Sequence, residues 1–503
     1  MDLIESKAIT ATSRPSLNMR LENFRLFRDS GWFKVAPLTC LVGRNSSGKS
    51  SIVSSLLLLK QSLEQQALGT APMALTLSGP YCDLGNYSDV VYDHDESSDI
   101  TFSFSASLAN IRTDSREKRG QLVDFSVPRP LPASRPYFGR WIDQKLLPRV
   151  GSIEVRLRFS ADERFGPSLS RLEVEISKLG TASFVRTSGL ERSQHWRVYT
   201  TELPPQSLAF RPTQRSFFPA IEVRSSSYRH SAPRTKHRIR SFVAACQAMF
   251  RYVSESLVFS NQVGPFRTPP ERRYAGGFGA SRSGPSGEQA VGLLITEALL
   301  RSPGQRSLHR EVSFWIKHLG LARSLDVRDL AKRLNLFEVD IKGARRGTEA
   351  NLTDVGFGIS QILPVLVQGL LMQRGGIYLV QQPEIHLHPD AQAGLADFFI
   401  YLAGNGVTTI VETHSEYLLL RLRRRLAEGA TPISSGRPLV DDVRPLALNE
   451  VAVLLTGTDQ TEAAVRELKI NESFQFSNMP SGFMSQALDD RAALLRSLGK
   501  RNA

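Results

Sequence analysis

The stretch GRNSSGKS, residues 43–50, decides the fold class of this chain. Its spacing is G-x-x-x-x-G-K-[ST]; the apolar run before it (38–42) predicts a strand, and the run 50–66 predicts a helix. The two glycines let the backbone turn tightly, so that successive N–H groups face phosphate oxygens. The stretch is therefore predicted to be a phosphate-binding P-loop, and the chain an α/β protein.

The residues of this loop predict a nucleotide site with a metal ion. Lys49 would reach the β- and γ-phosphates, and the Ser50 hydroxyl would be a ligand of Mg²⁺. The helix that follows directs the positive end of its dipole at the same anion. ATP and Mg²⁺ are the expected cofactors. The predicted nucleotide-binding residues are Arg44, Asn45, Ser46, Ser47, Gly48, Lys49, Ser50 and Ser51.

The composition is that of a globular protein with a core, because 41% of the 503 residues are hydrophobic and 22% are charged. This length allows two or three domains, or one large domain with an insertion. No apolar run approaches the ~20 residues that span a bilayer, and the opening MDLIESKAIT lacks the order of a secretory signal. The three cysteines are widely separated, which argues against a disulfide framework or a zinc site. A cytoplasmic protein with no membrane contact is expected.

The chain is strongly basic, with a net charge of +14 and a pI near 9.9. A basic excess favours anionic partners, most often nucleic acid, because binding releases counterions from the phosphates. Residues 224–240 hold six Lys or Arg, two His and no acid. This run is interpreted either as a nucleic-acid contact or as a solvated basic loop.

A second motif, IYLVQQPEIHLHP at 377–389, is an apolar strand that ends in two glutamines. In nucleotide hydrolases such a strand usually ends in carboxylates, which hold Mg²⁺ and polarise a water. An amide has the size of a carboxylate, but it is uncharged and accepts no proton near pH 7. Losing a general base costs ~10²–10⁴ in rate, whereas binding through the P-loop survives. Slow or blocked hydrolysis is predicted.

The segment from LENF (21–24) through the P-loop helix resembles the N-terminus of RecF-like, SMC-like and overcoming-lysogenization-defect (OLD) ATPases, soluble relatives of ABC transporter motors. The resemblance implies an α/β fold with an ABC-ATPase-like P-loop head. Such a head has a mixed sheet with flanking helices and an antiparallel β subdomain, here with a compact mid-chain insertion. The expected parts are an N-terminal head part (1–110), a basic insertion (111–255), a C-terminal head part (256–440) and a small C-terminal domain (441–503).

The same resemblance assigns the second half of the site. Gly356, Phe357 and Gly358 begin an apolar helix and resemble the signature segment, which binds the γ-phosphate of ATP held by the opposite subunit. Unpaired N–H groups and the helix dipole supply the attraction. His414, after the strand GVTTIVET, resembles the switch histidine that contacts the γ-phosphate. ATP shared between two copies implies a homo-oligomer, a dimer or higher.

The predicted catalytic residues are Gln381, Gln382, Glu384 and His414. By resemblance, Gln381 occupies the position that supports Mg²⁺ together with Ser50, and Gln382 occupies that of the general base. Three explanations stay open: a deliberate Glu→Gln change that traps the ATP state, a slow hydrolase that uses Glu384 or another acid, or a nucleotide-gated switch that scarcely turns over. A subgroup of AAA/ABC-like ATPases with a short C-terminal domain of unknown function has a similar Glu-Gln-Pro-Glu order. In that case Gln382 is native and Gln381 is the substituted position.

The resemblance implies an ABC/OLD-type ATPase, a nucleotide-dependent sensor or scaffold that assembles with itself and controls a separate effector, a nuclease or toxin, in anti-phage defence. The effector is expected to be separate because the aspartate pair at 441–442 is not followed by the acidic strands of a Toprim nuclease. Two alternatives are a RecF-like DNA-repair ATPase and a nucleotide-gated scaffold with little hydrolysis. Arg267 is interpreted either as a phosphate contact or as a solvated loop residue.

Overall fold

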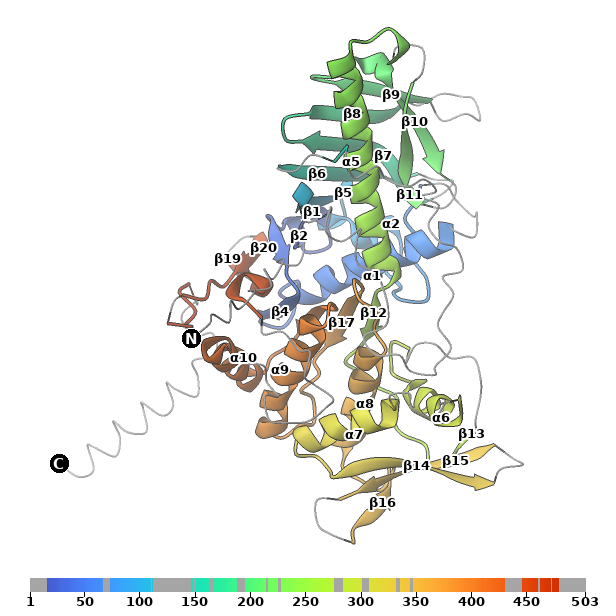
Figure 1. Ribbon diagram of the computed structural model, residues 1–503, viewed down its shortest axis with the longest axis vertical. Coiled ribbons are helices and arrows are strands. Elements are labelled where there is room, and N and C mark those ends of the chain that lie inside the picture. The colour runs from blue at the N-terminus through green and yellow to red at the C-terminus, as the bar shows by residue number, and fades with distance from the viewer. Residues whose placement is uncertain are drawn as a thin grey trace, which may run out of the picture.

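The computed structural model describes residues 16–66, 73–109, 111, 146–147, 151–162, 166–187, 195–213, 216–224, 228–275, 284–300, 307–331, 335–343, 347–429, 446–459, 462–471 and 473–478. An antiparallel sheet lies at one end of the long axis, a mixed sheet lies in the middle, and helices with a small sheet lie at the other end (Figure 1). The predicted α/β class with a mixed sheet, flanking helices and an antiparallel sheet is confirmed.

The mixed sheet carries the P-loop. Its strand order is β12-β17-β18-β4-β19-β20, and all neighbouring strands are parallel except the last pair. A central parallel strand is covered on both faces, and β4 is accordingly buried along its whole length. The strands are β12 (Asn261–Val263), β17 (Ile377–Gln381), β18 (Thr408–Glu412), β4 (Leu38–Gly43), β19 (Val451–Asp459) and β20 (Glu462–Glu467).

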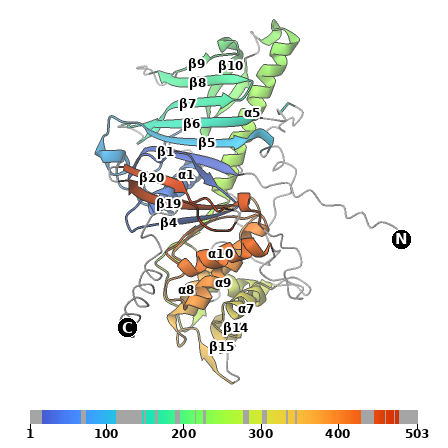
Figure 2. The ribbon, with the colours of Figure 1, turned by 90° about the vertical axis from the view of Figure 1, so that its left-hand side faces the viewer.

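Alternate residues of β4 enter two different hydrophobic cores, because successive side chains of a strand point to opposite faces. Leu41 packs in the core that contains α1 and the antiparallel sheet. Cys40 and Val42 pack in the other core, among helices α8, α9 and α10. Figure 2 shows the antiparallel strands on one side of β4 and β19, and these helices on the other. The helices are α1 (Lys49–Gln66), α8 (Phe357–Leu370), α9 (Pro389–Gly404) and α10 (Glu416–Glu428).

The antiparallel sheet has eight strands in the order β2-β1-β5-β6-β7-β8-β9, with β3 paired to β1. Strand β6 alternates buried and partly exposed residues, the pattern of a strand with one face on a core. The strands are β1 (Leu17–Phe24), β2 (Phe27–Asp29), β3 (Phe33–Val35), β5 (Ile100–Ser107), β6 (Ser152–Ser160), β7 (Ser168–Ile176), β8 (Gly180–Thr187) and β9 (His195–Thr200). Strands β6 to β9 therefore extend the sheet begun by β1 and β5, although they fall in the range expected as an insertion.

A long helix, α5 (Pro233–Val258), packs along this sheet and reaches its far end (Figure 1). Its first turns hold much of the basic run 224–240, and Arg238 forms an ion pair with Glu202 there. A hairpin and three short helical elements complete this end of the described chain and its link to α1. They are β10 (Leu208–Thr213), β11 (Ser216–Val223), η2 (Pro205–Ser207), α2 (Tyr87–Val90) and η1 (Tyr92–His94).

The small sheet at the opposite end packs with two helices against α8. Its strands are β13 (Tyr274–Ala275), β14 (Ser324–Ala331), β15 (Leu336–Lys342) and β16 (Glu349–Asn351), and the helices are α6 (Ala290–Leu300) and α7 (Leu308–His318). Among the described residues, no helix is both long and apolar enough to cross a membrane.

Strands β19 and β20 fall in the range expected as a small C-terminal domain. In the structure, β19 follows the turn η3 (Leu448–Glu450) and pairs in parallel with β4 along the whole P-loop strand. These strands therefore belong to the mixed sheet, and the part of 441–503 beyond residue 478 lies outside the described residues. The domain boundaries stay a prediction.

Candidate functional site

Two glycines give the P-loop its shape. Gly43 has a φ of +148° and Gly48 a φ of +103°, both in the region that side chains rarely adopt. A Cβ atom on Gly43 would lie 2.3 Å from the carbonyl oxygen of Thr456, and one on Gly48 would lie 2.7 Å from the Phe27 ring. Strands β2 and β19 thus approach the loop so closely that only glycine fits at both positions.

Thr456 of β19 holds the P-loop in place through hydrogen bonds. Its hydroxyl donates to the Val42 carbonyl at 3.3 Å, which leaves it free to accept the Ser47 hydroxyl at 2.6 Å. The sequence alone assigns no role to Thr456. The contact joins residues 409 positions apart, so local pattern carries no signal for it.

Lys49 begins α1 and is 4% exposed. Its ammonium donates to the carbonyl oxygens of Gly43 at 3.0 Å and Arg44 at 2.7 Å. Burial lowers the pKa of Lys49, and the charge of Glu412 partly opposes this shift. A phosphate between Lys49 and the loop would therefore meet a cation held in position by the backbone.

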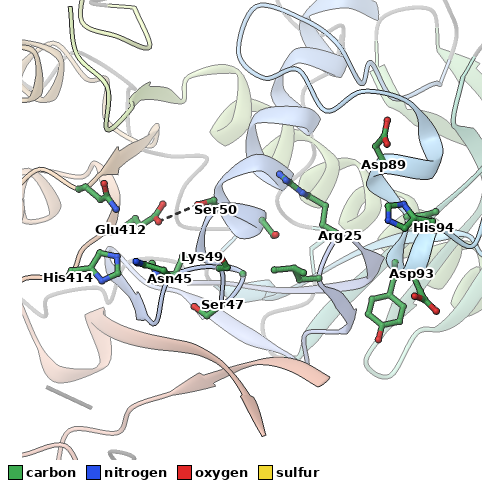
Figure 3. Close-up of a pocket in the computed structure, with 17 residues that line it drawn as sticks. Arg25, Asn45, Ser47, Lys49, Ser50, Asp89, Asp93, His94, Glu412 and His414 are labelled. Carbon is green, nitrogen blue, oxygen red and sulfur yellow. Dashed lines mark hydrogen bonds between the residues drawn. The ribbon is translucent and has the colours of Figure 1, made fainter. Parts of the chain in front are cut away.

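A cavity of about 690 Å³ lies over the loop (Figure 3), a size typical of ligand pockets. It extends from the P-loop and His414 to a second wall with Arg25, Asp89 and His94. The lining residues are Arg25, Leu26, Asn45, Ser46, Ser47, Gly48, Lys49, Ser50, Ser51, Asp89, Val91, Tyr92, Asp93, His94, Gln382, Glu412 and His414. Of the predicted residues, Arg44, Gln381, Glu384 and the signature segment do not line it.

One acid lines the phosphate end of the cavity, and it is Glu412, the last residue of β18. It is 5% exposed. One carboxylate oxygen lies 3.4 Å from the Ser50 hydroxyl (Figure 3). The other accepts the Gln381 amide at 2.8 Å. The sequence placed Glu412 two residues before the predicted switch histidine but gave it no role.

A buried arginine donates hydrogen bonds to the turn that contains Gln381 and Gln382, hereafter the glutamine turn. Arg267, 6% exposed, donates to the carbonyl oxygens of Gln381 at 2.8 Å and Gln382 at 3.2 Å. Burial lowers the pKa of Arg267. It is therefore neither a phosphate contact nor a solvated loop residue, and both interpretations from the sequence were wrong. Gln382 has a φ of +45° and lines the cavity, whereas Gln381 lies behind Glu412.

Glu384 and His414, the other two predicted catalytic residues, are joined by a hydrogen bond from the backbone of His414. Glu384 is 9% exposed and accepts the backbone N–H of His414 at 2.5 Å. Burial raises the pKa of Glu384, which lies outside the cavity lining. Burial, followed by the nearby charge of Lys49, lowers the pKa of His414, so its imidazole is neutral near pH 7. A neutral imidazole can still donate one hydrogen bond to a phosphate oxygen.

The predicted signature segment, residues 356–358, lies outside the lining of this cavity. Gly356 is the N-cap of α8, and a Cβ atom added to it would meet nothing within 4 Å. Phe357 is 69% exposed. Gly358 packs against the turn after β17, where a Cβ atom would lie 3.1 Å from the His386 carbonyl oxygen. The structure thus brings together the P-loop, Gln382 and His414 in one chain, and leaves the predicted signature on the surface.

Comparison with known proteins gives one family match. Residues 312–419 match the AAA ATPase domain. The matched range runs from α7 into α10 and contains the signature segment, the glutamine turn and His414, and it supports an ATPase of the AAA type. No curated protein is significantly similar to the chain.

Several solved structures resemble the chain at low sequence identity. An SMC head bound to the C-winged helix domain of ScpA has a TM-score of 0.40 and 12% identity, and the match covers 91% of this chain and 98% of that one. The SMC head with an extended coiled coil bound to the C-terminal domain of ScpA, from Pyrococcus furiosus, has a TM-score of 0.39 and 10% identity, covering 96% and 99%. The SMC head domain from Thermotoga maritima has a TM-score of 0.33 and 11% identity, covering 91% and 100%.

Proposed function

We propose that the protein binds Mg–ATP in the cavity over the P-loop and hydrolyses it slowly. The observation that carries the proposal is the convergence of the buried Lys49, the other P-loop residues of the range 45–51 and a carboxylate beside Ser50 at one end of a ligand-sized cavity. Slow turnover is proposed because Gln382 lines the cavity and, by the resemblance, replaces the general base, and an amide cannot accept a proton near pH 7. Glu384 is turned toward the backbone of His414 and is out of reach of the cavity.

Lys49→Ala is expected to weaken ATP binding at least tenfold, about 1.4 kcal/mol, because the loop loses the cation that faces the β- and γ-phosphates. Titration with a fluorescent ATP analogue measures the affinity, and steady-state phosphate release measures turnover. Lys317→Ala, at an exposed residue of α7, is the matched control and keeps wild-type affinity. Unchanged ATP affinity in Lys49→Ala contradicts the proposal. Tight binding without phosphate release in the wild type favours the scaffold alternative.

Self-association driven by ATP is the second part of the proposal. The exposed N-terminus of α8, with Gly356 and Phe357, can receive the γ-phosphate only from another molecule, because it does not line its own cavity. Unpaired N–H groups at a helix N-terminus favour an anion there. Two copies would then enclose two nucleotides.

Phe357→Asp is expected to abolish ATP-dependent association, because it places a carboxylate where the partner's triphosphate would approach. Sedimentation velocity with and without Mg–ATP measures the mass, and ATP binding by the monomer should stay within about threefold of wild type. Tyr199→Asp, an exposed aromatic residue on β9, controls for the loss of an exposed ring. Association that persists in Phe357→Asp rejects this surface as the interface.

Control of a separate effector in anti-phage defence is proposed on the resemblance of the P-loop and of the IYLVQQPEIHLHP stretch to OLD-like ATPases. DNA degradation by the purified chain with Mg²⁺ alone would contradict an effector that is separate. The RecF-like alternative is favoured by exposed basic residues near the start of α5, among them Arg229 just before the helix and Arg234 and Arg240 in its first turns. It requires salt-sensitive DNA binding that is lost when these residues are neutralised.

A further inference from the structure

The Mg–ATP site proposed above has an amide where related ATPases have a metal-binding carboxylate. We propose that Glu412, on the neighbouring strand, supplies the carboxylate that binds the divalent cation of the nucleotide, and that Gln381 positions it. The inference rests on the proposed function, because the metal would arrive with the nucleotide. It assigns the predicted metal role of Gln381 to a different residue.

Strand order places Glu412 closer to the P-loop than Gln381. The two residues are direct partners in the parallel pair β17–β18, and β18 lies between β17 and the P-loop strand β4. Neighbouring strands are about 4.8 Å apart, so Gln381 starts one strand further from the loop. Glu412 lines the cavity, whereas Gln381 does not.

The side-chain contacts give the two residues different tasks. A carboxylate only accepts hydrogen bonds, so the Gln381 amide must turn its NH₂ group toward Glu412, and the 2.8 Å contact fixes that orientation. The amide therefore offers no lone pair on this side. The hydrogen bond holds one Glu412 oxygen and leaves the other directed at Ser50.

The negative charge of the buried Glu412 carboxylate favours a cation beside it. Within the described residues its carboxylate has two side-chain hydrogen-bond partners, the Gln381 amide and the Ser50 hydroxyl, and neither is positively charged. The Lys49 ammonium attracts Glu412 electrostatically but donates to two backbone carbonyl oxygens of the P-loop, and forms no close ion pair with this carboxylate. Glu412 is 5% exposed, and a buried carboxylate that is not in contact with a cation is costly. A divalent cation at this position would neutralise it next to the bound phosphates.

The donor set fits Mg²⁺. This ion takes oxygen ligands at ~2.1 Å in an octahedron, so that adjacent ligands lie about 3 Å apart. The Ser50 and Glu412 oxygens are 3.4 Å apart, too long for a strong hydrogen bond between hydroxyl and carboxylate but close to this spacing. Mg²⁺ is typically held by one or two carboxylates together with substrate phosphates. One hydroxyl and one carboxylate from the protein match that pattern.

The test compares ATP binding with and without metal in the full-length chain. Glu412→Gln keeps the size of the side chain and can still accept the Gln381 amide, but removes the charge. A fluorescent ATP analogue is titrated in Mg²⁺ and in EDTA, and the electron paramagnetic resonance signal of free Mn²⁺ measures metal bound in the presence of ATP. Glu416→Gln, four residues later and outside the cavity lining, is the matched control.

In Glu412→Gln, the gain in ATP affinity caused by Mg²⁺ is expected to fall at least tenfold, and Mn²⁺ binding in the presence of ATP is expected to weaken equally. Affinity in EDTA should be equal to that of the wild type or tighter, because an anion beside the phosphates is gone. Unchanged metal dependence in Glu412→Gln, with normal ATP binding, overturns the inference alone. A wild-type protein that binds no ATP in either buffer overturns the proposed function, and the inference with it.

Discussion

Replacing Gly43 with alanine is expected to distort the P-loop, to abolish measurable ATP binding and to lower the free energy of unfolding by about 3 kcal/mol. The new Cβ atom would lie 2.3 Å from the Thr456 carbonyl oxygen and 2.7 Å from the Ser47 hydroxyl. The Thr456 carbonyl cannot move away easily, because it is part of the backbone of β19. The Ser47 hydroxyl is held by its hydrogen bond with the Thr456 hydroxyl. The backbone at Gly43 also has a φ of +148°, which alanine avoids.

The variant Gly31→Ala separates the effect of backbone strain from that of the steric overlap. Gly31 has a φ of +67°, and an added Cβ atom there would meet nothing within 4 Å. This control should cost about 1 kcal/mol from backbone strain alone and leave ATP affinity unchanged. Urea unfolding monitored by circular dichroism, together with ATP titration, measures both effects. Wild-type ATP affinity in Gly43→Ala would show that β19 does not confine the loop.

Asp397→Asn is expected to destabilise the helical end of the protein by about 3–5 kcal/mol, the cost of breaking a buried ion pair from one side. Asp397 of α9 has a fully buried side chain, and its oxygens accept Arg425 at 2.8 Å, Arg421 at 2.9 Å and His318 at 2.9 Å. These contacts join α7, α9 and α10. An asparagine removes the counter-charge of Arg421 and leaves Arg425 with Glu428 alone. Asp354→Asn, in the exposed pair with Arg272, is the control and should cost far less.

The effect of Asp397 depends on pH in a defined direction. Burial alone would raise the pKa of Asp397, but the hydrogen bond from His318 and the contacts with Arg425 and Arg421 outweigh burial and lower it. A carboxyl whose folded pKa is depressed stabilises the fold above its unfolded value, about 3.9, and loses that contribution as the pH falls through the folded pKa. Urea midpoints of wild type and Asp397→Asn should therefore differ most near pH 7 and converge below about pH 4. A difference that stays constant down to pH 3 would contradict this account.

The parts of the site that depend on local sequence could be predicted. The P-loop needs only the eight residues from Gly43 to Ser50, and the structure places all but Arg44 of its predicted ligands on the cavity wall. The α/β class follows from a strand, a loop and a helix in that order. The glutamine turn and His414 could likewise be found from their own short motifs.

The rest depends on contacts between distant segments. Glu412 meets Ser50 across 362 positions and Thr456 meets Ser47 across 409, so neither role has a local pattern. Arg267 gave no sign of being buried beneath the glutamine turn, because a charged residue in a stretch rich in Gly and Pro (264–270) is typical of an exposed loop. Likewise, alternating residues in 152–160 are typical of a strand, but the pairing of β6 with β5 depends on the register between strands, which a single strand does not encode.

The position of β19 has a consequence for biosynthesis. Residues 451–459 pair with β4 and supply Thr456, which fixes the P-loop. On the ribosome, the nucleotide-binding loop is translated hundreds of residues before this strand emerges. A nascent chain that ends before β19 would therefore carry the motif but not its finished geometry, and the proposed nucleotide site would be complete only after residues 451–459 have left the ribosome.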